Sequence, residues 1–261
     1  MKHKIYLSLF LIIISGTSLF GQLKYTFPQF WRETGDFIKQ PVNWDGGDWL
    51  KLGVVSAATF LMMETADQPI RDAVLKNQRY SKSFPIEFGR MWGEIYSPIV
   101  LFSGFAAYSL LTDDIGTRKI AYEVGQASLY AAGISFVLKL AIGRSRPYLN
   151  EGAHSFSPFA SIFNQDNKSI PSGHSTVAFI LSTVLSRNIK SPVWKALVYL
   201  PAVLTLISRV YQDKHWASDA FAGAALGYFV ATWVVDHHEN NSNSILGMSP
   251  TYPISIRIAL N

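Results

Sequence analysis

The residues best suited to chemistry lie late in the chain, where His215 is followed by Asp219. On a helix this i, i+4 spacing places the carboxylate beside the imidazole. A carboxylate on one ring nitrogen fixes the tautomer, leaves the other nitrogen as a nucleophile and stabilises the cation that forms on attack. We therefore expect His215 to be a nucleophile and Asp219 to be the group that orients it.

Cationic side chains lie upstream of this pair in two segments. Lys139 and Arg146 are seven residues apart, so on a helix they share one face, and Pro147 then ends the helix. Arg209 follows Ser208 and precedes His215. Two cations on one face at a helix end can bind one anion from adjacent sides, so these segments predict an anion site.

A third segment, Pro171-Ser172-Gly173-His174, comes directly before an apolar helical run. Ser172 suits the N-cap of that helix, and Gly173 lets the backbone approach a ligand closely. The free N–H groups and the dipole of a helix start favour an anion. His174 is then expected at the edge of the anion site, where it can serve as a proton donor.

Together the three segments supply what phosphoryl transfer needs, because that reaction depends mainly on positioning and on stabilising charge. Clustered Lys and Arg side chains can serve where other enzymes use magnesium. We therefore predict no required metal and no cofactor.

The motifs K-x6-RP, PSGH and SR-x5-H-x3-D resemble those of the type 2 phosphatidic acid phosphatase (PAP2) superfamily, which also holds bacterial acid phosphatases and vanadium haloperoxidases. The resemblance implies that His215 attacks phosphorus and becomes a phosphohistidine, held by Asp219. It implies that His174 protonates the leaving oxygen and then assists the attacking water. It also implies a set of phosphate-binding residues: Lys139, Arg146, Ser172, Gly173 and Arg209.

Other polar residues receive ordinary interpretations. Arg144 lies inside the first motif but off its fixed positions, and Asp213 and Lys214 are expected at the surface near His215. The run Asp236-His237-His238-Glu239 has the composition of a metal cluster. Because it follows a helix and continues into polar residues, we interpret it as a solvated helix end.

Apolar content and length predict an all-α fold, a six-helix bundle of the PAP2/haloperoxidase type. The expected helices are 48–64, 95–111, 118–142, 174–187, 192–208 and 218–236, with longer connections at 65–94 and 148–171. The predicted organisation is a signal peptide or N-terminal anchor (1–21), an aromatic N-terminal arm (22–47), a phosphatase domain (48–238) and an irregular tail (239–261). In that tail, alternating apolar residues from Ile254 to Leu260 are the main strand signal.

Composition limits the class of protein. The chain has 261 residues, 49% of them hydrophobic and 16% charged, which indicates an apolar helical protein that could be membrane-embedded. The absence of cysteine excludes disulfides, thiolate metal sites and Cys nucleophiles. The net charge of +5 suits a phosphorylated substrate or an anionic lipid surface, and no nucleic-acid-binding motif is present.

The membrane topology has two readings. The turn that carries Arg187, Lys190 and Lys195 is basic, so the positive-inside rule places it in the cytoplasm and the site outside. A cleaved signal peptide followed by three crossings would instead place the first motif inside. Either the N-terminal segment is uncleaved and does not span, or the domain is secreted whole. We expect a bacterial-type cell-envelope protein whose site faces the periplasm, with the number of crossings open.

The aromatic arm also has two readings, since it could pack on the domain or lie at the membrane–water boundary that Trp favours. The expected substrate is a lipid phosphate or an isoprenoid pyrophosphate. The alternatives are a secreted acid phosphatase for small soluble monoesters, a vanadate-dependent haloperoxidase and a non-catalytic envelope protein.

Overall fold

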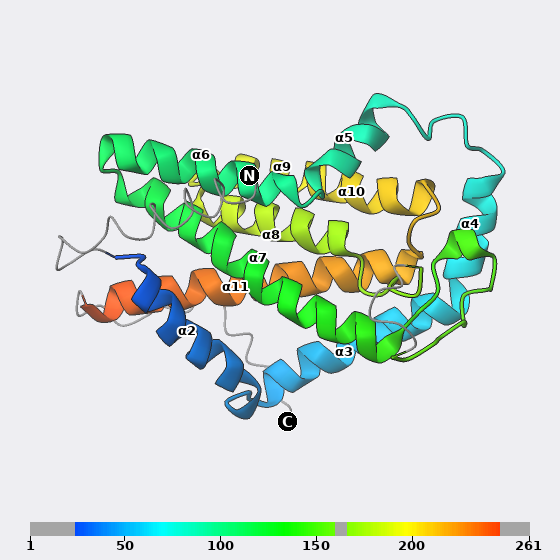
Figure 1. Cartoon of the computed structure of the whole chain (residues 1–261), viewed down its shortest axis with the longest axis horizontal. Helices are drawn as coiled ribbons and strands as arrows, with labels where there is room; N and C mark the ends of the chain where they lie inside the picture. The colour runs from blue at the N-terminus through cyan, green and yellow to red at the C-terminus, as the bar shows by residue number, and fades with distance from the viewer. Residues whose placement is uncertain (1–23, 160–165, 246–261) are drawn as a thin grey trace, which may run out of the picture.

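The computed structural model describes residues 24–159 and 166–245. The expected signal segment 1–21 and the alternating residues 254–260 lie outside the described residues. Within the described part the chain is all-α, as predicted, and contains no strand (Figure 1). The helices are α2 (Phe27–Lys39), α3 (Gly46–Thr65), α4 (Asp67–Leu75), α5 (Phe84–Trp92), α6 (Tyr96–Thr112), α7 (Ile115–Ile142), α8 (Gly173–Asn188), α9 (Pro192–Leu197), α10 (Leu200–Tyr211) and α11 (Ala217–Ile245), with 3₁₀ turns η1 (Gln40–Val42) and η2 (Pro147–Leu149).

Every predicted helix overlaps an observed one, but the helical content is larger than expected. The arm 22–47 contains α2, and the connection 65–94 contains α4 and α5. The range 192–208 is divided between α9 and α10, and α11 continues to Ile245 where the tail was expected to begin at 239. Short helices in connections were missed because nine-residue segments carry too few apolar positions to show a helical period.

Polar caps start several of these helices. Asp45 accepts from Asp48 N at 2.9 Å at the start of α3, and Asp114 accepts from Thr117 N at 3.0 Å at the start of α7. Gly143 ends α7 with φ +60°, a conformation that L side chains rarely adopt, and a Cβ there would lie 2.1 Å from Ser157 O. The chain therefore turns sharply after α7, directly before Arg144.

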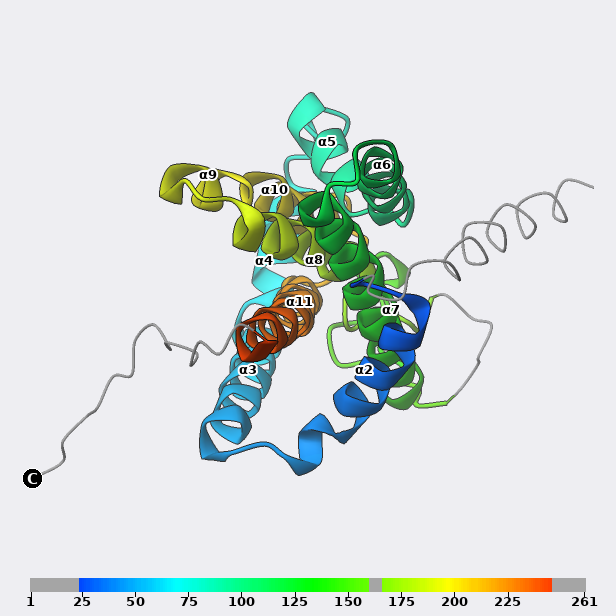
Figure 2. The same cartoon turned by 90° about the vertical axis from the view of Figure 1, so that its left-hand side faces the viewer.

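The core lies where α8 packs against α7 and α11 (Figures 1 and 2). Val124 of α7, Leu181 of α8 and Val234 of α11 are fully buried members of one apolar cluster. A Cβ on Gly223 of α11 would lie 2.4 Å from Ser172 O. The absence of a side chain at Gly223 thus allows α11 to lie directly against the start of α8, where the PSGH motif lies.

Helix α2 packs on α7 and α11 at the opposite end from that motif. The Glu33 side chain is 1% exposed and accepts from Gln126 Nε2 at 2.9 Å, and Phe37 stacks on Tyr130 with ring centroids 4.3 Å apart. The outer face carries Trp31, 59% exposed, and Ile38, 71% exposed. Both readings of the arm therefore describe part of it: one face packs on the domain and the other presents apolar groups outward.

The interpretation of residues 236–239 as a solvated helix end was wrong for His238. Its ring is 2% exposed and lies between two carboxylates, with Nε2 3.2 Å from Glu33 Oε2 and Nδ1 3.2 Å from Glu123 Oε1. Asp236 and Glu239 pair with Arg187 instead. Sequence position near a helix end gave no sign of this burial because α2, which covers His238, lies about 200 residues earlier.

Three helical segments are long and apolar enough to cross a membrane: Ile115–Ile142, Pro192–Tyr211 and Ala217–Glu239. The pair α5 and α6 meets the same test together but is bent by 65° at the break between them. Many large apolar side chains on these helices are exposed, including Leu111, Val137 and Leu200. Such a surface suits lipid contact better than water.

Candidate active site

The predicted motifs meet at one end of the bundle, where α7 and α10 end and α8 and α11 begin (Figure 1). His215 lies in the link between α10 and α11 and is 3% exposed. Its backbone N–H donates to Arg209 O at 3.3 Å, and Ser172 N donates to Asp219 O at 2.9 Å. The contact between Ser172 and Asp219 joins the PSGH and SR-x5-H-x3-D motifs through the backbone.

His215 and Asp219 are neighbours, but for a different reason from the one predicted. Helix α11 begins at Ala217, so His215 precedes the helix instead of lying one turn back within it. Asp219 Oδ2 accepts from Trp216 N at 3.0 Å, which folds the link over the first turn of α11. His215 Nδ1 then lies 3.8 Å from Asp219 Oδ2.

A serine that the sequence analysis did not single out completes this contact. Ser169 donates to Asp219 Oδ2, and its Oγ lies 3.5 Å from His215 Nδ1. The Nδ1 side of the ring therefore faces Ser169 and Asp219, which leaves Nε2 as the reactive nitrogen. Burial, followed by the charges of Arg146 and Lys139, lowers the pKa of His215 to about 3 against the opposing effect of Asp219, so the ring is neutral at pH 7.

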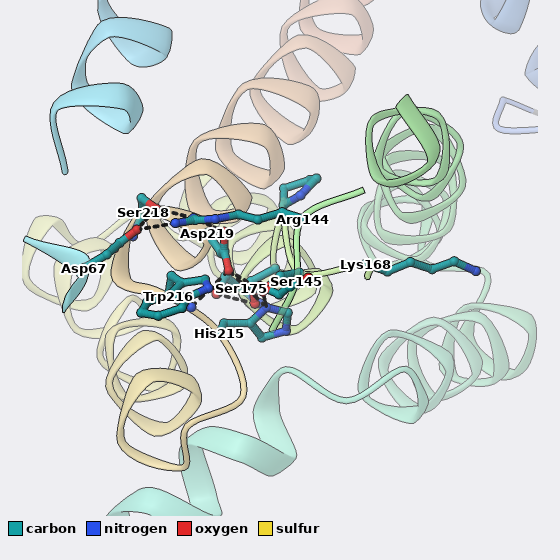
Figure 3. Close-up of polar contacts among 12 residues, drawn as sticks. Asp67, Arg144, Ser145, Lys168, Ser175, His215, Trp216, Ser218 and Asp219 are labelled. Carbon is teal, nitrogen blue, oxygen red and sulfur yellow. Dashed lines mark hydrogen bonds and ion pairs between the residues drawn. The ribbon is translucent and has the colours of Figure 1, made fainter. Parts of the chain in front are cut away.

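Asp219 is held in turn by Arg144, and the ordinary interpretation of Arg144 was wrong. Its guanidinium is fully buried and donates to Asp219 Oδ1 at 2.7 Å and to Asp67 Oδ2 at 2.8 Å. Ser218 accepts from Arg144 and donates to Asp67 (Figure 3). The sequence contained one sign of this role for Arg144: an extra arginine at the end of a helix, next to a motif that is buried, needs partners. No feature of the sequence pointed to Asp67, because it lies in a connection far upstream.

Ser172 is the N-cap of α8, as predicted. Its Oγ accepts from Ser175 N at 3.4 Å and from the Ser175 hydroxyl at 3.0 Å, and α8 begins at Gly173. His174 follows in the first turn, with its side chain 28% exposed. Burial and the charge of Arg209 lower the pKa of His174 to about 4, and Glu94, 3.3 Å away, acts in the opposite direction.

The predicted cations surround the two histidines. Lys139 Nζ donates to Lys168 O at 2.8 Å and to Pro171 O at 2.5 Å, so it also holds the segment that leads into Ser172. Arg209 is 4% exposed, and its Nε has no hydrogen-bond partner within the described residues. The charge of Arg146 lowers the pKa of both histidines, so its guanidinium acts electrostatically on the site. An unpartnered buried guanidinium N–H here suits an anionic oxygen.

Asp213 and Lys214, both expected at the surface near His215, differ in how exposed they are. Asp213 pairs with Arg71 at 2.8 Å and is 18% exposed, so it is largely covered. Lys214 is exposed, as predicted, and its Nζ lies 4.8 Å from the centre of the Tyr148 ring. In the part of the chain that the structure describes, no group of His, Asp and Glu has the arrangement of a metal site.

Comparison with known proteins agrees with this geometry. Residues 123–243 match the family model described as PAP2 superfamily. A lipid A 1-phosphatase of Porphyromonas gingivalis is 37% identical over 93 residues, 34% of this chain and 21% of that protein. A lipid A 1-phosphatase of Rhizobium johnstonii is 29% identical over 209 residues, 76% of this chain and 81% of that protein.

A PA-phosphatase-related family protein of Dictyostelium discoideum is 28% identical and covers 60% of each chain. No solved structure matches the chain significantly. The matched region contains most of the site, from Lys139 to Asp219. Residues 123–243 thus match the PAP2 superfamily, and together with the lipid A 1-phosphatase relatives this match supports a PAP2-type phosphatase acting on phosphate esters.

Proposed function

We propose that this protein removes phosphate from a membrane lipid through a covalent phosphohistidine on His215. The observation that carries the proposal is the position of His215, a buried and neutral imidazole beside Lys139, Arg146 and Arg209 at one end of an apolar helix bundle. A neutral ring nitrogen has the lone pair that attack requires. The neighbouring cations stabilise the phosphoryl charge.

In the proposed first step, His215 Nε2 attacks phosphorus and forms a P–N bond while the P–O bond to the lipid breaks. His174, held protonated by the negative charge of the bound phosphate, gives its proton to the leaving oxygen, so the lipid departs as an alcohol. In the second step, a water molecule attacks the phosphohistidine and gives a proton to His174. The P–N bond then breaks, inorganic phosphate leaves and both histidines return to their starting states.

The phosphate oxygens are assigned to Lys139, Arg146 and Arg209, together with the N–H groups at the start of α8 next to Ser172 and Gly173. Asp219, fixed by Arg144 and Ser169, holds the Nδ1 side of His215 and stabilises the imidazolium that forms on attack. These residues supply positive charge without a metal ion. We therefore propose metal-independent catalysis.

The lipid substrate is proposed on two grounds. The site lies at the end of helices with exposed apolar faces, among them three long enough to cross a membrane. Two relatives that align over 76% and 72% of this chain are named lipid A 1-phosphatases. A phosphorylated glycolipid of the lipid A type is thus the first candidate, ahead of phosphatidate and isoprenoid pyrophosphates.

The proposed location is the cell envelope, with the site on the periplasmic face. The end of the bundle opposite the site carries the turn with Arg187, Lys190 and Lys195, which the positive-inside rule assigns to the cytoplasm. The orientation is tested by introducing a cysteine into that turn and measuring its labelling by a thiol reagent in intact and in permeabilised cells. Labelling of a Ser191→Cys variant in intact cells would contradict it.

The function is tested by phosphate release from detergent-solubilised protein, with lipid A, phosphatidate, an isoprenyl pyrophosphate and p-nitrophenyl phosphate as substrates. We expect turnover of a lipid in the presence of EDTA, inhibition by vanadate and loss of turnover in His215→Ala. His154→Ala is the matched control, because His154 is an exposed histidine.

Each alternative has its own outcome. Activity confined to p-nitrophenyl phosphate would support an acid phosphatase for soluble monoesters and defeat the lipid proposal. Full activity in His215→Ala would defeat the assignment of the nucleophile. Loss of activity in EDTA that added metal restores would defeat metal independence.

A further inference from the structure

The link between α5 and α6 brings a carboxylate to His174 from outside the sequence motifs. Residues 93–95 join the two helices, whose axes are bent by 65°. A Cβ on Gly93 would lie 2.7 Å from His174 O and 2.9 Å from His174 Cβ. The link therefore packs closely against the first turn of α8, and this contact holds Glu94, the next residue, beside His174.

Glu94 contacts the histidine directly and is itself fixed. Its Oε1 lies 3.3 Å from His174 Nε2 and accepts from Arg90 Nη1 at 2.9 Å. Arg90 is anchored a second time by Glu87, whose Oε2 accepts from Arg90 Nε at 2.7 Å. With the side chain of Glu94 only 25% exposed, this carboxylate has a defined position.

Burial and the surrounding positive charges disfavour protonation of His174, and Glu94 offsets part of this effect. Arg209 from α10 and Arg146 from the segment after α7 both face the ring and disfavour its cationic form. Among the groups that act on the ring, Glu94 is the one carboxylate in the described residues, and it acts in the opposite direction to the two arginines. A proton donor in such a cationic site needs a negative partner to hold its proton.

We propose that Glu94 is a positioning residue for the general acid: its charge lies beside Nε2 of His174, stabilises the imidazolium and leaves Nδ1 to serve the leaving oxygen. In the described residues the contact is an ion pair and not a hydrogen bond, because Nε2 has no hydrogen-bond partner. His215 also has a carboxylate beside its ring, although there Asp219 lies 3.8 Å from Nδ1, so each histidine of the site has its own carboxylate. This inference rests on the proposed role of His174 as proton donor. Glu94 does not touch the reacting atoms.

The inference predicts that replacing Glu94 slows release of the leaving group most when that group must be protonated in order to depart. p-Nitrophenolate departs without protonation, whereas the alkoxide of benzyl phosphate does not, and the two esters are of similar size. Glu94→Gln removes the charge but keeps the shape and an oxygen that can accept from Arg90, which also retains Glu87. The variant is therefore expected to fold.

The experiment measures single-turnover release of the leaving group by the full-length protein in detergent, with both esters. In Glu94→Gln we expect release of benzyl alcohol to slow by roughly 10²-fold, the scale of general acid catalysis, while release of p-nitrophenolate changes by less than about threefold. The alkaline limb of the benzyl phosphate pH profile should move to lower pH. His174→Ala should show the same selectivity, and the double variant should lose no more than His174→Ala alone.

Glu64→Gln is the control, because Glu64 also pairs with a histidine, His154, at 2.9 Å, but both side chains are exposed. It should change neither rate. An equal loss on both esters in Glu94→Gln, or no loss on either, would overturn the positioning role. Failure of the wild-type protein to release phosphate from any ester would defeat the proposed function, and the role of Glu94 with it.

Discussion

Arg144 donates to Asp219 at 2.7 Å, and neither side chain has any exposed surface. The same guanidinium binds Asp67 at 2.8 Å, so one buried cation balances two buried carboxylates that come from α4 and α11. This arrangement fixes the carboxylate behind His215 and also connects two helices that are distant in sequence. A residue outside the fixed motif positions thus supports both the fold and the site.

Replacing Arg144 with Ala should destabilise the protein strongly. It leaves Asp67 and Asp219 buried without a counter-charge, and breaking a buried ion pair from one side costs about 3–5 kcal/mol. Denaturant unfolding in detergent measures the loss.

Asp67→Asn keeps the contact between Arg144 and Asp219, so it should retain more activity than Asp219→Asn. Equal activity of these two variants would contradict the separate role of Asp219.

Ser169→Ala should slow catalysis without weakening substrate binding. The hydroxyl donates to Asp219 and touches His215, and a hydrogen bond to a charged group contributes about 1.5–3 kcal/mol. We expect kcat to fall by roughly tenfold or more with little change in KM. Ser182→Ala is the control, because Ser182 is equally buried but binds Val198 O away from the site. A rise in KM alone would argue against this role.

The stability of the protein should rise with pH between about 3 and 6.5. His215 and His174 have pKa values of about 3 and about 4 in the folded protein, below the ordinary 6.5 that they regain on unfolding. The unfolded chain therefore binds more protons in this window, and folding becomes more favourable as protons are removed. Melting temperatures from pH 4 to 8 test the slope. It should be shallower in His215→Asn and unchanged in His154→Asn; an unchanged slope in His215→Asn would contradict the assignment.

The contact between α2 and the bundle should depend on Glu33. Burial alone would raise the pKa of Glu33, but hydrogen bonds with His238, Gln29 and Gln126 outweigh it and lower the pKa to about 2. The ionised carboxylate thus stabilises the fold fully above its ordinary value of 4.5, and this contribution is lost as the pH falls towards 2.

Glu33→Gln should therefore lower the melting temperature at pH 7, and its difference from the wild type should narrow at pH 3. Glu64→Gln, which changes an exposed carboxylate, should show no such narrowing. A difference that stays constant with pH would mean that Glu33 contributes by packing and not by charge.

The sequence by itself determined the class of the fold and predicted the chemistry of the site. Spacing within each segment, together with the family resemblance, predicted one anion site from a set of residues: Lys139, Ser172, His174, Arg209, His215 and Asp219. The N-cap at Ser172 followed from local backbone chemistry alone. Long apolar runs likewise predicted helices near their observed bounds.

Only the tertiary structure decided which distant residues support that site. Asp67 binds Arg144, which lies 77 residues later in the chain. Glu94 faces His174, 80 residues later, and Glu33 faces His238, 205 residues later. Their positions depend on how helices cross, which is set by close contacts such as those at Gly93 and Gly223. Local spacing has no information about such crossings, because it describes neighbours along one helix and not the helix that packs against it.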